Sequence, residues 1–299
     1  MNLFIAVQRI LPMLNLWKIS FIMYKGVIMS LPGTFKSVKK DGTIYYRSSI
    51  TFKNKHISLG SFITEEEAYF AYQEALDLLA SDKFSIQSYA PSFHLTFEKW
   101  VILINFRDNK IYFSTPIYVK KKFFYYYLSP NLHFTFDMDD LFFYASHKIS
   151  KRNGHLFVAD YGMQLTIKNR YGIKNYAVLG KDYRFINGDE YDFRYENIEI
   201  INTYHGVEKI FYKKKERYQA KLHLNGNFII GYYSTPLEAA IAYNKAIDTV
   251  RKNGITKKFV YNEMEGVSPS IYADIYSRLK ISSKIENYNI SSHRQSPKD

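Results

Sequence analysis

The sequence contains no cysteine, so neither disulfide bonds nor thiolate zinc sites can contribute to the fold. This absence is compatible with a reducing cytoplasm. Long apolar runs are also missing, because Arg9, Lys18 and Lys25 interrupt the apolar N-terminal stretch before it reaches the roughly 18 residues that a membrane helix needs. The stretch lacks the uninterrupted apolar core and small-residue cleavage site of a signal peptide. We interpret residues 1–30 as an N-terminal extension or a misassigned translation start, with Met29 as the alternative start.

Negative charge is scarce in this chain. Asp and Glu number 28 against 41 Lys and Arg, which gives a net charge of +13 over 299 residues. Such an excess attracts polyanions, of which a nucleic acid is the commonest and an anionic membrane surface the main alternative. Hydrophobic residues make up 46% of the chain, enough for two or three globular domains with cores of their own.

Two segments of the chain are internal repeats of each other. "LGSFITEEEAYFAYQEALD" begins at Leu59 and "IGYYSTPLEAAIAYNKAID" begins at Ile230, 171 positions later. In both, a Thr followed three residues later by Glu predicts a helix that starts with a capping box. Small apolar residues then recur at helical spacing, which predicts a helix lying close to a sheet. The shared positions are Gly60/Gly231, Thr64/Thr235, Glu67/Glu238, Ala68/Ala239, Ala71/Ala242, Tyr72/Tyr243, Ala75/Ala246 and Asp77/Asp248.

A strand, a tight turn and a second strand are predicted just before each helix. Asn225-Gly226 is a strong hairpin signal in the second copy. Because successive strand side chains point to opposite faces, one alternating set packs on the helix and the other faces outward. The outward set is basic and hydrogen-bonding, and comprises Arg47, Ser49, Thr51 and Lys53 in the first copy and Arg217, Gln219, Lys221 and His223 in the second.

The charge of the second copy favours DNA binding. Residues 205–258 hold 11 Lys and Arg against 4 Asp and Glu. Lys213, Lys214 and Lys215 lie at the entry of the predicted strand, where they could neutralise phosphates. The alternative is that each outward strand face is the ordinary solvated surface of an α+β domain.

Both copies resemble the ethylene-response-factor (Apetala-two) DNA-binding domain, over residues 31–82 and 204–260. The resemblance rests on Gly206-Val207, on Gly231 with Tyr233, and on Glu238-Ala239-Ala240; the first copy has Gly33-Thr34 instead of Gly-Val. It implies a three-stranded antiparallel sheet packed on one helix, with the sheet entering the DNA major groove and its outward side chains reading bases. Both copies lack the tryptophans typical of plant members, so no base preference is implied.

The stretch "FINGDEYDFRYENIEI" resembles the HNH endonuclease family, in the variant that phage and mobile-element homing enzymes combine with a following ethylene-response-factor-like domain. The resemblance covers about residues 149–203. The residues that match the family pattern are Ile186, Asn187, Gly188, Asp189, Asp192, Arg194, Glu196 and Asn197.

The departures from that pattern fall on the chemistry. Arg184-Phe185 replaces the family's Asp-His pair, and Phe193 replaces an Asn. Phenylalanine neither accepts a proton nor binds a cation, and an arginine repels a divalent ion. We therefore expect a pseudo-nuclease ββα module without catalytic residues, metal or cofactor. The matching residues would then serve the fold, with Asn187-Gly188 in the turn and Ile186, Ile198 and Ile200 in the packing.

Other uses of this stretch stay open. Arg184 could bind a DNA phosphate in place of the lost metal. His147 or His155 could approach the site as a displaced base, and Asp189, Asp192 and Glu196 could in principle hold a metal, although acidic residues in tight turns usually serve the turn.

The remaining segments carry weaker patterns. In residues 90–148, a β-rich spacer or small domain, we predict two or three strands around Asp108-Asn109 and a short helix in "FDMDDLFFYASHKI". "KKKFFYYY" contains rings that pack in a core or stack on single-stranded bases. Residues 261–299 are polar, and we expect a tail that frays.

Together these patterns predict a multidomain α+β protein that binds double-stranded DNA sequence-specifically, at a bipartite or pseudo-repeated site in the cytoplasm, in association with the nucleoid. The favoured function is a transcriptional regulator derived from a mobile-element HNH homing endonuclease that has lost catalysis. The alternatives are an active homing endonuclease with an atypical centre and an integrase-accessory DNA-binding protein.

Overall fold

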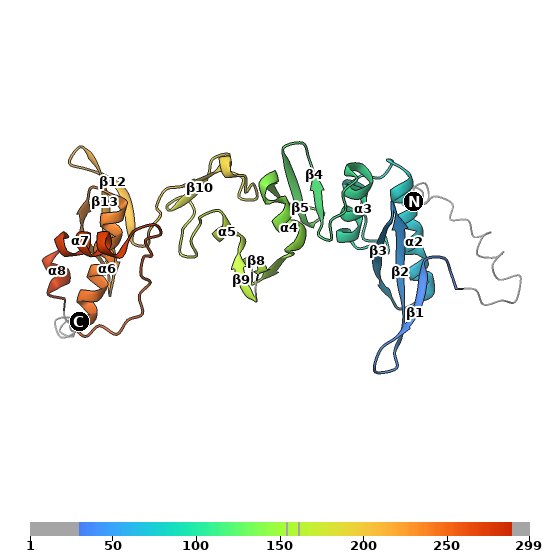
Figure 1. Cartoon of the computed structure of the whole chain (residues 1–299), viewed down its shortest axis with the longest axis horizontal. Coiled ribbons are helices and arrows are strands. Elements are labelled where there is room, and N and C mark those ends of the chain that lie inside the picture. Colours follow the sequence, from blue (N-terminus) through green and yellow to red (C-terminus); the bar gives the residue numbers. More distant parts are fainter. Residues whose placement is uncertain (1–29, 154, 161, 289–299) are drawn as a thin grey trace, which may run out of the picture. The chain divides into compact units, whose positions relative to one another are not determined.

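The computed structural model describes residues 30–153, 155–160 and 162–288 (Figure 1). The predictions for the N-terminal segment before residue 30 and for residues 289–299 therefore lie outside the described residues. The chain divides into two compact units, one within Met1–Lys120 and Tyr125–His133, the other within Lys121–Phe124 and Phe134–Asp299. Small three-stranded antiparallel sheets and helices make up both, which confirms the α+β class. Among the described residues, no helix is long and apolar enough to span a membrane.

The first copy of the repeat is a three-stranded sheet covered on one face by a helix. The strands β1 (Thr34–Val38), β2 (Ile44–Phe52) and β3 (Lys55–Phe62) pair antiparallel in that order and are followed by α2 (Glu65–Ala80). Ile50, Ile57 and Leu59 are buried, together with Ala71 and Ala75 of the helix. Small side chains on one helical face let the helix approach the sheet closely, as the spacing predicts.

The second copy has the same order of elements. Its strands are β12 (Val207–Tyr212), β13 (Lys215–His223) and β14 (Asn227–Tyr233), and its helix is α6 (Pro236–Lys252). Both predicted capping boxes are confirmed: Thr64 and Thr235 accept hydrogen bonds from the backbone N–H groups of Glu67 and Glu238, and each Glu carboxylate accepts one in return. The hairpin at Asn225-Gly226 is confirmed too, since it lies between β13 and β14.

The two copies agree in details that the sequence offset does not reveal. Each middle strand has a register shift, after Ser48 in β2 and after Ala220 in β13. Gly33 and Gly206 have φ of +75° and +71°, and a Cβ at either would lie inside a ring of the following helix, that of Tyr72 or Tyr243. Only glycine accepts both the backbone conformation and the contact.

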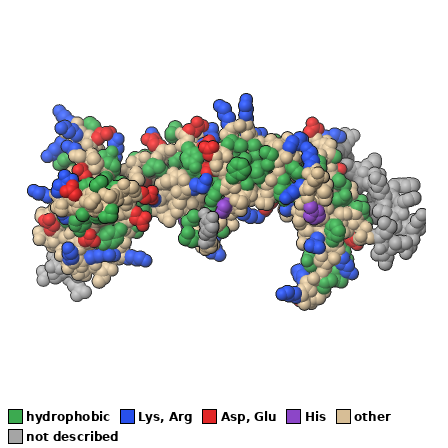
Figure 2. All heavy atoms as spheres, in the orientation of Figure 1, with side chains coloured by type: hydrophobic (Ala, Val, Ile, Leu, Met, Phe, Trp, Pro, Cys, Tyr) green, Lys and Arg blue, Asp and Glu red, His purple; other side chains and the backbone are tan. Residues whose placement is uncertain are grey.

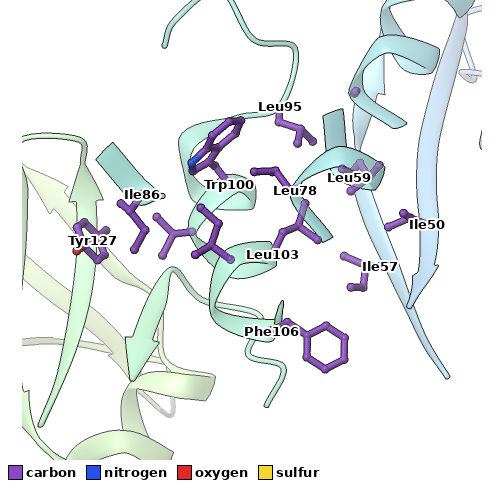
Figure 3. Packing of buried hydrophobic residues seen from close by; sticks show 14 residues of the cluster. Ile50, Ile57, Leu59, Leu78, Ile86, Leu95, Trp100, Leu103, Phe106 and Tyr127 are labelled. Carbon is purple, nitrogen blue, oxygen red and sulfur yellow. The ribbon is translucent and has the colours of Figure 1, made fainter. Parts of the chain in front are cut away.

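A third layer completes the core of the first unit. Helix α3 (Phe97–Asn109) begins at the N-cap Thr96, and its residues Trp100–Phe106 are all buried. Trp100, Leu103 and Phe106 of this helix join Leu78 of α2 and Ile57 of β3 in one hydrophobic cluster (Figure 3). The prediction of a strand before Asp108-Asn109 is wrong, because this segment is helix α3. A helix that is buried on every side shows no 3.6-residue period, so its apolar run cannot be distinguished from that of a strand.

The segment that follows α3 forms a second small sheet. It consists of β4 (Ile117–Val119), β5 (Phe123–Ser129) and β6 (Leu132–Asp137), and the boundary between the two units runs through β5 and β6. This region is flanked by the 3₁₀ turns Ile86–Ser88 and Met138–Asp140 and by helix α4 (Leu141–Ser146). Helix α4 confirms the predicted short helix. In "KKKFFYYY", Phe124, Tyr126 and Tyr127 are buried, so these rings are core rather than a stacking platform.

The HNH-like segment contains short strands and little helix. A sheet of β7 (Ile149–Arg152), β8 (His155–Asp160) and β9 (Met163–Thr166) precedes the single turn α5 (Ile167–Arg170), and β10 (Tyr183–Phe185) then pairs antiparallel with β11 (Ile198–Ile200) after the 3₁₀ turn Tyr195–Asn197. The predicted ββα module lacks its helix, because residues 201–206 run without helix from β11 into β12.

The C-terminal segment packs on the second copy. Helices α7 (Pro269–Arg278) and α8 (Ser283–Glu286) follow α6, and Ile285 and Tyr288 belong to its hydrophobic core. Lys245 of α6 donates hydrogen bonds to the carbonyl oxygens of Tyr276 and Leu279. The prediction that the chain frays after Tyr261 is therefore wrong for residues 262–288, whose few apolar anchors are spaced too widely to give a periodic pattern.

Candidate nucleic-acid interface

The outward face of the second sheet carries most of the predicted contact residues. Ala220 and Leu222 point inward and are buried, so the alternate side chains of β13 point away from α6. The pairs across this face are Tyr212/Lys215, Ile210/Arg217, Glu208/Gln219/Tyr232, Lys221/Ile229 and His223/Asn227.

The lysines that precede β13 are exposed at the end of the sheet. Lys213 and Lys214 form the two-residue turn between β12 and β13, with φ of +49° and +61°. Two-residue hairpin turns of type I′ have positive φ at both positions, which Asn-Gly supplies at less cost than two lysines. Figure 2 shows Lys and Arg side chains gathered at this end of β12 and β13.

Within the sheet, the predicted contact residues already have partners in the protein. Arg217 donates a hydrogen bond to the Ser234 hydroxyl, and Nδ1 of the exposed His223 lies 3.0 Å from Oδ1 of Asn227. Gln219 is only 7% exposed between Glu208 and Tyr232, contrary to the expectation of an accessible side chain.

Lys221 forms an ion pair with a neighbouring strand. Its Nζ lies 2.9 Å from Oε2 of Glu208, and both side chains are about one-third exposed. The hydrogen bond from Lys221 lowers the pKa of the Glu208 carboxyl more than its partial burial raises it. Glu208 therefore stays ionised at neutral pH and competes with any phosphate or base for Lys221.

A stacked pair of tyrosines, absent from the sequence-based prediction, lies on the same face. The rings of Tyr212 and Tyr232 are parallel, with centroids 4.2 Å apart. They come from β12 and β14, the two strands that flank β13. The alternation of side chains along each strand could have predicted that these tyrosines face outward, because Tyr212 and Tyr232 lie on the same face of the sheet as Arg217.

The outward face of the first sheet is more hydroxyl-rich. Arg47 and Thr51 are exposed and Ser49 is half-buried, as the alternation predicts. Lys53 lies instead in the two-residue turn with Asn54, again with positive φ at both positions. The pairs across this face are Phe35/Arg47/Ser61, Ser37/Tyr45, Ser49/Ser58 and Thr51/His56.

Aromatic packing fills the place where the HNH pattern has its base. Phe185 and Phe193 are 7% and 2% exposed, and their ring centroids lie 5.6 Å apart. Phe193 also contacts the rings of Phe136 and Tyr171. The rings of Phe185 and Phe193 offer neither a proton acceptor nor a cation ligand.

The matching polar residues hold the loop between β10 and β11. Asp192 accepts hydrogen bonds from Arg194 Nε and Nη2, at 2.9 and 2.6 Å, and from Asn187 Nδ2. Burial raises the pKa of Asp192, but these bonds outweigh it and the net pKa lies below the ordinary value. Asn197 accepts from the backbone N–H of Asn187 and donates to the Asp192 carbonyl, and Asp189 accepts from the Tyr191 N–H. The acidic residues are thus used within the loop.

Two packing expectations for this segment, those for Ile186 and Ile200, are wrong. Ile186 is 63% exposed and Ile200 is also exposed, so neither packs in the core; Ile198 is half-buried. Arg184 points away from the buried rings and pairs with Glu199 across the strands at 2.6 Å. It is exposed, but its charge is already matched.

The two histidines that could act as displaced bases lie in different surroundings. His147 stacks on Phe143 and its Nδ1 lies 2.8 Å from the Phe143 carbonyl oxygen. His155 is exposed on β8 and lines a cavity together with Glu190 and Phe193. Within residues 30–153, 155–160 and 162–288, no group of three His, Asp or Glu side chains is arranged to hold a metal.

Comparisons with protein-family models, with curated proteins and with solved structures find no match to this chain.

Proposed function

We propose that the chain binds double-stranded DNA through the outward faces of its two repeated sheets and does not cleave it. The observation that carries the proposal is the repeat itself: the same sheet-and-helix unit occurs twice, and in both copies the helix covers one face and leaves a strand face with exposed cations. A β-sheet face fits the DNA major groove, where base edges are distinguishable.

The charge distribution supports duplex binding. Lys213, Lys214 and Lys215 are exposed at one end of the second sheet, where phosphates of the same groove can reach them. Two linked reading units raise affinity through effective concentration and lengthen the recognised site. The biological role we favour is transcriptional regulation from a bipartite site.

The aromatic packing supports a non-catalytic role for residues 149–203. Phe185 and Phe193 are packed in a ring cluster, and Asp192 has its oxygens engaged by Arg194 and Asn187. Metal-dependent hydrolysis needs a metal site as well as a base, and among the described residues no group of three His, Asp or Glu side chains is arranged to hold a metal.

Selection of bound duplexes from a random pool tests the proposal. We expect enrichment of one bipartite sequence whose affinity exceeds that of random duplex by at least a factor of 10³. Supercoiled plasmid incubated with magnesium or manganese should stay intact, and nicking abolished by a substitution within 182–202 would contradict the non-catalytic assignment. Genome-wide occupancy with altered transcripts after deletion distinguishes a regulator from an accessory protein.

A further inference from the structure

The two sheets have inward faces of similar character but different outward surfaces. Counting from Ser48 and Ala220, which lie opposite Gly60 and Gly231, aligns the two faces residue by residue. The pairs are Phe35/Glu208, Ser37/Ile210, Tyr45/Arg217, Arg47/Gln219, Ser49/Lys221, Thr51/His223, His56/Asn227, Ser58/Ile229 and Ser61/Tyr232, with Lys39/Tyr212 at the end of the first strand. None of these pairs is identical.

The contrast with the inner side indicates different targets. Helix positions packed against the sheets, such as Ala71/Ala242, Tyr72/Tyr243 and Ala75/Ala246, are identical, and inward strand positions such as Ile50/Leu222 stay apolar. A surface that was merely solvated would not need apolar side chains at four positions where its counterpart is polar. The two copies therefore keep one scaffold and present two recognition surfaces.

The second face is apolar where the first is polar. Tyr212, Ile229 and Tyr232 are 36%, 42% and 37% exposed, and Ile210 is half-buried beside them on the same face. Their counterparts are Lys39, Ser58, Ser61 and Ser37. The first face keeps two rings, Phe35 and Tyr45, at positions where the second has Glu208 and Arg217.

The polar groups of the second face are largely engaged within the protein. Lys221 pairs with Glu208, His223 contacts Asn227, and Gln219 is buried. Hydrogen-bond readout from this face is correspondingly reduced, while the apolar surface of Tyr212, Tyr232 and their isoleucine neighbours stays accessible.

We propose that the second face recognises thymine-rich major groove by contact of Ile210, Tyr212, Ile229 and Tyr232 with thymine C5-methyl groups. The methyl group is the apolar feature among the base edges of the major groove. The cations at the edge, Lys213 to Lys215, are placed for the flanking phosphates, so that charge surrounds an apolar centre. This inference rests on the proposed DNA-binding function and makes the two half-sites different in sequence.

Replacing thymine by deoxyuridine tests the inference, because it removes the methyl group and leaves base pairing unchanged. On the duplex selected by the full chain, uracil in the half-site of the second sheet should weaken binding by about fourfold per contacted methyl group. The variants Tyr232→Ser and Ile229→Ser, which introduce the counterpart residues of the first sheet, should each bind thymine duplex more weakly and lose about a fourfold share of the uracil effect. Both side chains are exposed, and circular dichroism should report unchanged folding.

Ser61→Ala and Ser58→Ala in the first sheet are the matched controls and should keep the full uracil effect. Equal affinity for thymine and uracil duplexes would overturn the inference while leaving duplex binding intact. An undiminished uracil effect in both Tyr232→Ser and Ile229→Ser would also overturn it, and so would tighter binding of a thymine-rich single strand than of the duplex. Failure to prefer any duplex would instead remove the proposed function itself.

Discussion

Lys221 and Glu208 form a 2.9 Å ion pair on the outward face of the second sheet, in the middle of the surface assigned to DNA. A DNA-binding face that carries a carboxylate loses affinity twice, by repelling phosphates and by occupying a cation. The pair therefore makes Lys221 available only when DNA competes with Glu208.

Glu208→Gln should raise affinity for the selected duplex several-fold, because it releases Lys221 without removing a hydrogen-bonding side chain. Glu216→Gln is the matched control: it removes the same charge, but Glu216 pairs with Lys209 and has the opposite strand parity. Titration of both variants in parallel measures the difference. Equal gains would mean that only net charge matters and that the Lys221 pair has no special role.

The turn residues Lys213 and Lys214 should lower the stability of the fold while they raise its affinity for DNA. Replacing them by Asn and Gly should stabilise the fold by about 1 kcal/mol, because positive φ is costly for lysine. The slope of log affinity against log salt should fall by about 1.8, if each lysine contacts one phosphate. Asn54→Gly, at the second position of the positive-φ turn between β2 and β3, should stabilise without changing the slope. An unchanged slope in the Lys213/Lys214 variant would remove these lysines from the interface.

Arg217→Ala and Lys221→Ala should weaken specific binding more than a substitution in the polar C-terminal residues, such as Arg294→Ala. Arg217 and Lys221 lie on the sheet face, where loss of a base contact costs about 1–3 kcal/mol. The measurement is competition between the selected duplex and random duplex. Similar losses in all three variants would point to general charge rather than the strand face.

Phe185 should act through packing. Phe185→Ala should lower the free energy of unfolding by about 3 kcal/mol, since the ring is buried against Phe193. Ile186→Ala, at the adjacent exposed position, should change it by less than about 0.5 kcal/mol. Chemical denaturation of both variants makes the comparison. A Phe185→His variant should still not nick plasmid, because a new base alone does not provide a metal site. Cleavage by this variant would contradict the assignment of the segment as non-catalytic.

The lowered pKa of Asp192 predicts that the free energy of unfolding decreases in acid. Its pKa is lowered in the folded protein, so its contribution is fully present above the ordinary carboxyl pKa and disappears as pH falls through the lower, folded-state value. Denaturation between neutral pH and about pH 2 should show this decline in the free energy of unfolding. Asp192→Asn should be less stable than the wild type at neutral pH, and its free energy of unfolding should decline less as the pH falls. A decline of the same size in Asp192→Asn would assign it to other carboxyls.

Local signals predicted the repeat well. The capping boxes, the small-residue helical faces and the hairpin at Asn225-Gly226 depend on neighbouring residues, and all are present. Helix α3 escaped prediction because burial on every side erases its period. The segment after Tyr261 escaped it because Ile285 and Tyr288 are isolated anchors whose partners lie far away in the sequence.

The candidate site was predictable by strand parity but not by pairing. Alternation placed Arg47, Thr51, Arg217 and His223 on outward positions correctly. It could not show that Glu208 faces Lys221 or that Tyr212 stacks on Tyr232, because cross-strand neighbours depend on the register and on the shift after Ala220. The same information was needed to find that the two outward faces differ.

The most direct measurement is competition binding of the purified chain to its selected duplex, with the wild type compared with the Arg47→Ala/Arg217→Ala double variant. We predict strong preference for the selected duplex over random duplex in the wild type, much reduced in the variant, with the DNA recovered uncut. A wild-type chain that binds every duplex equally, or a double variant that keeps the preference, would contradict the assignment of the two sheet faces.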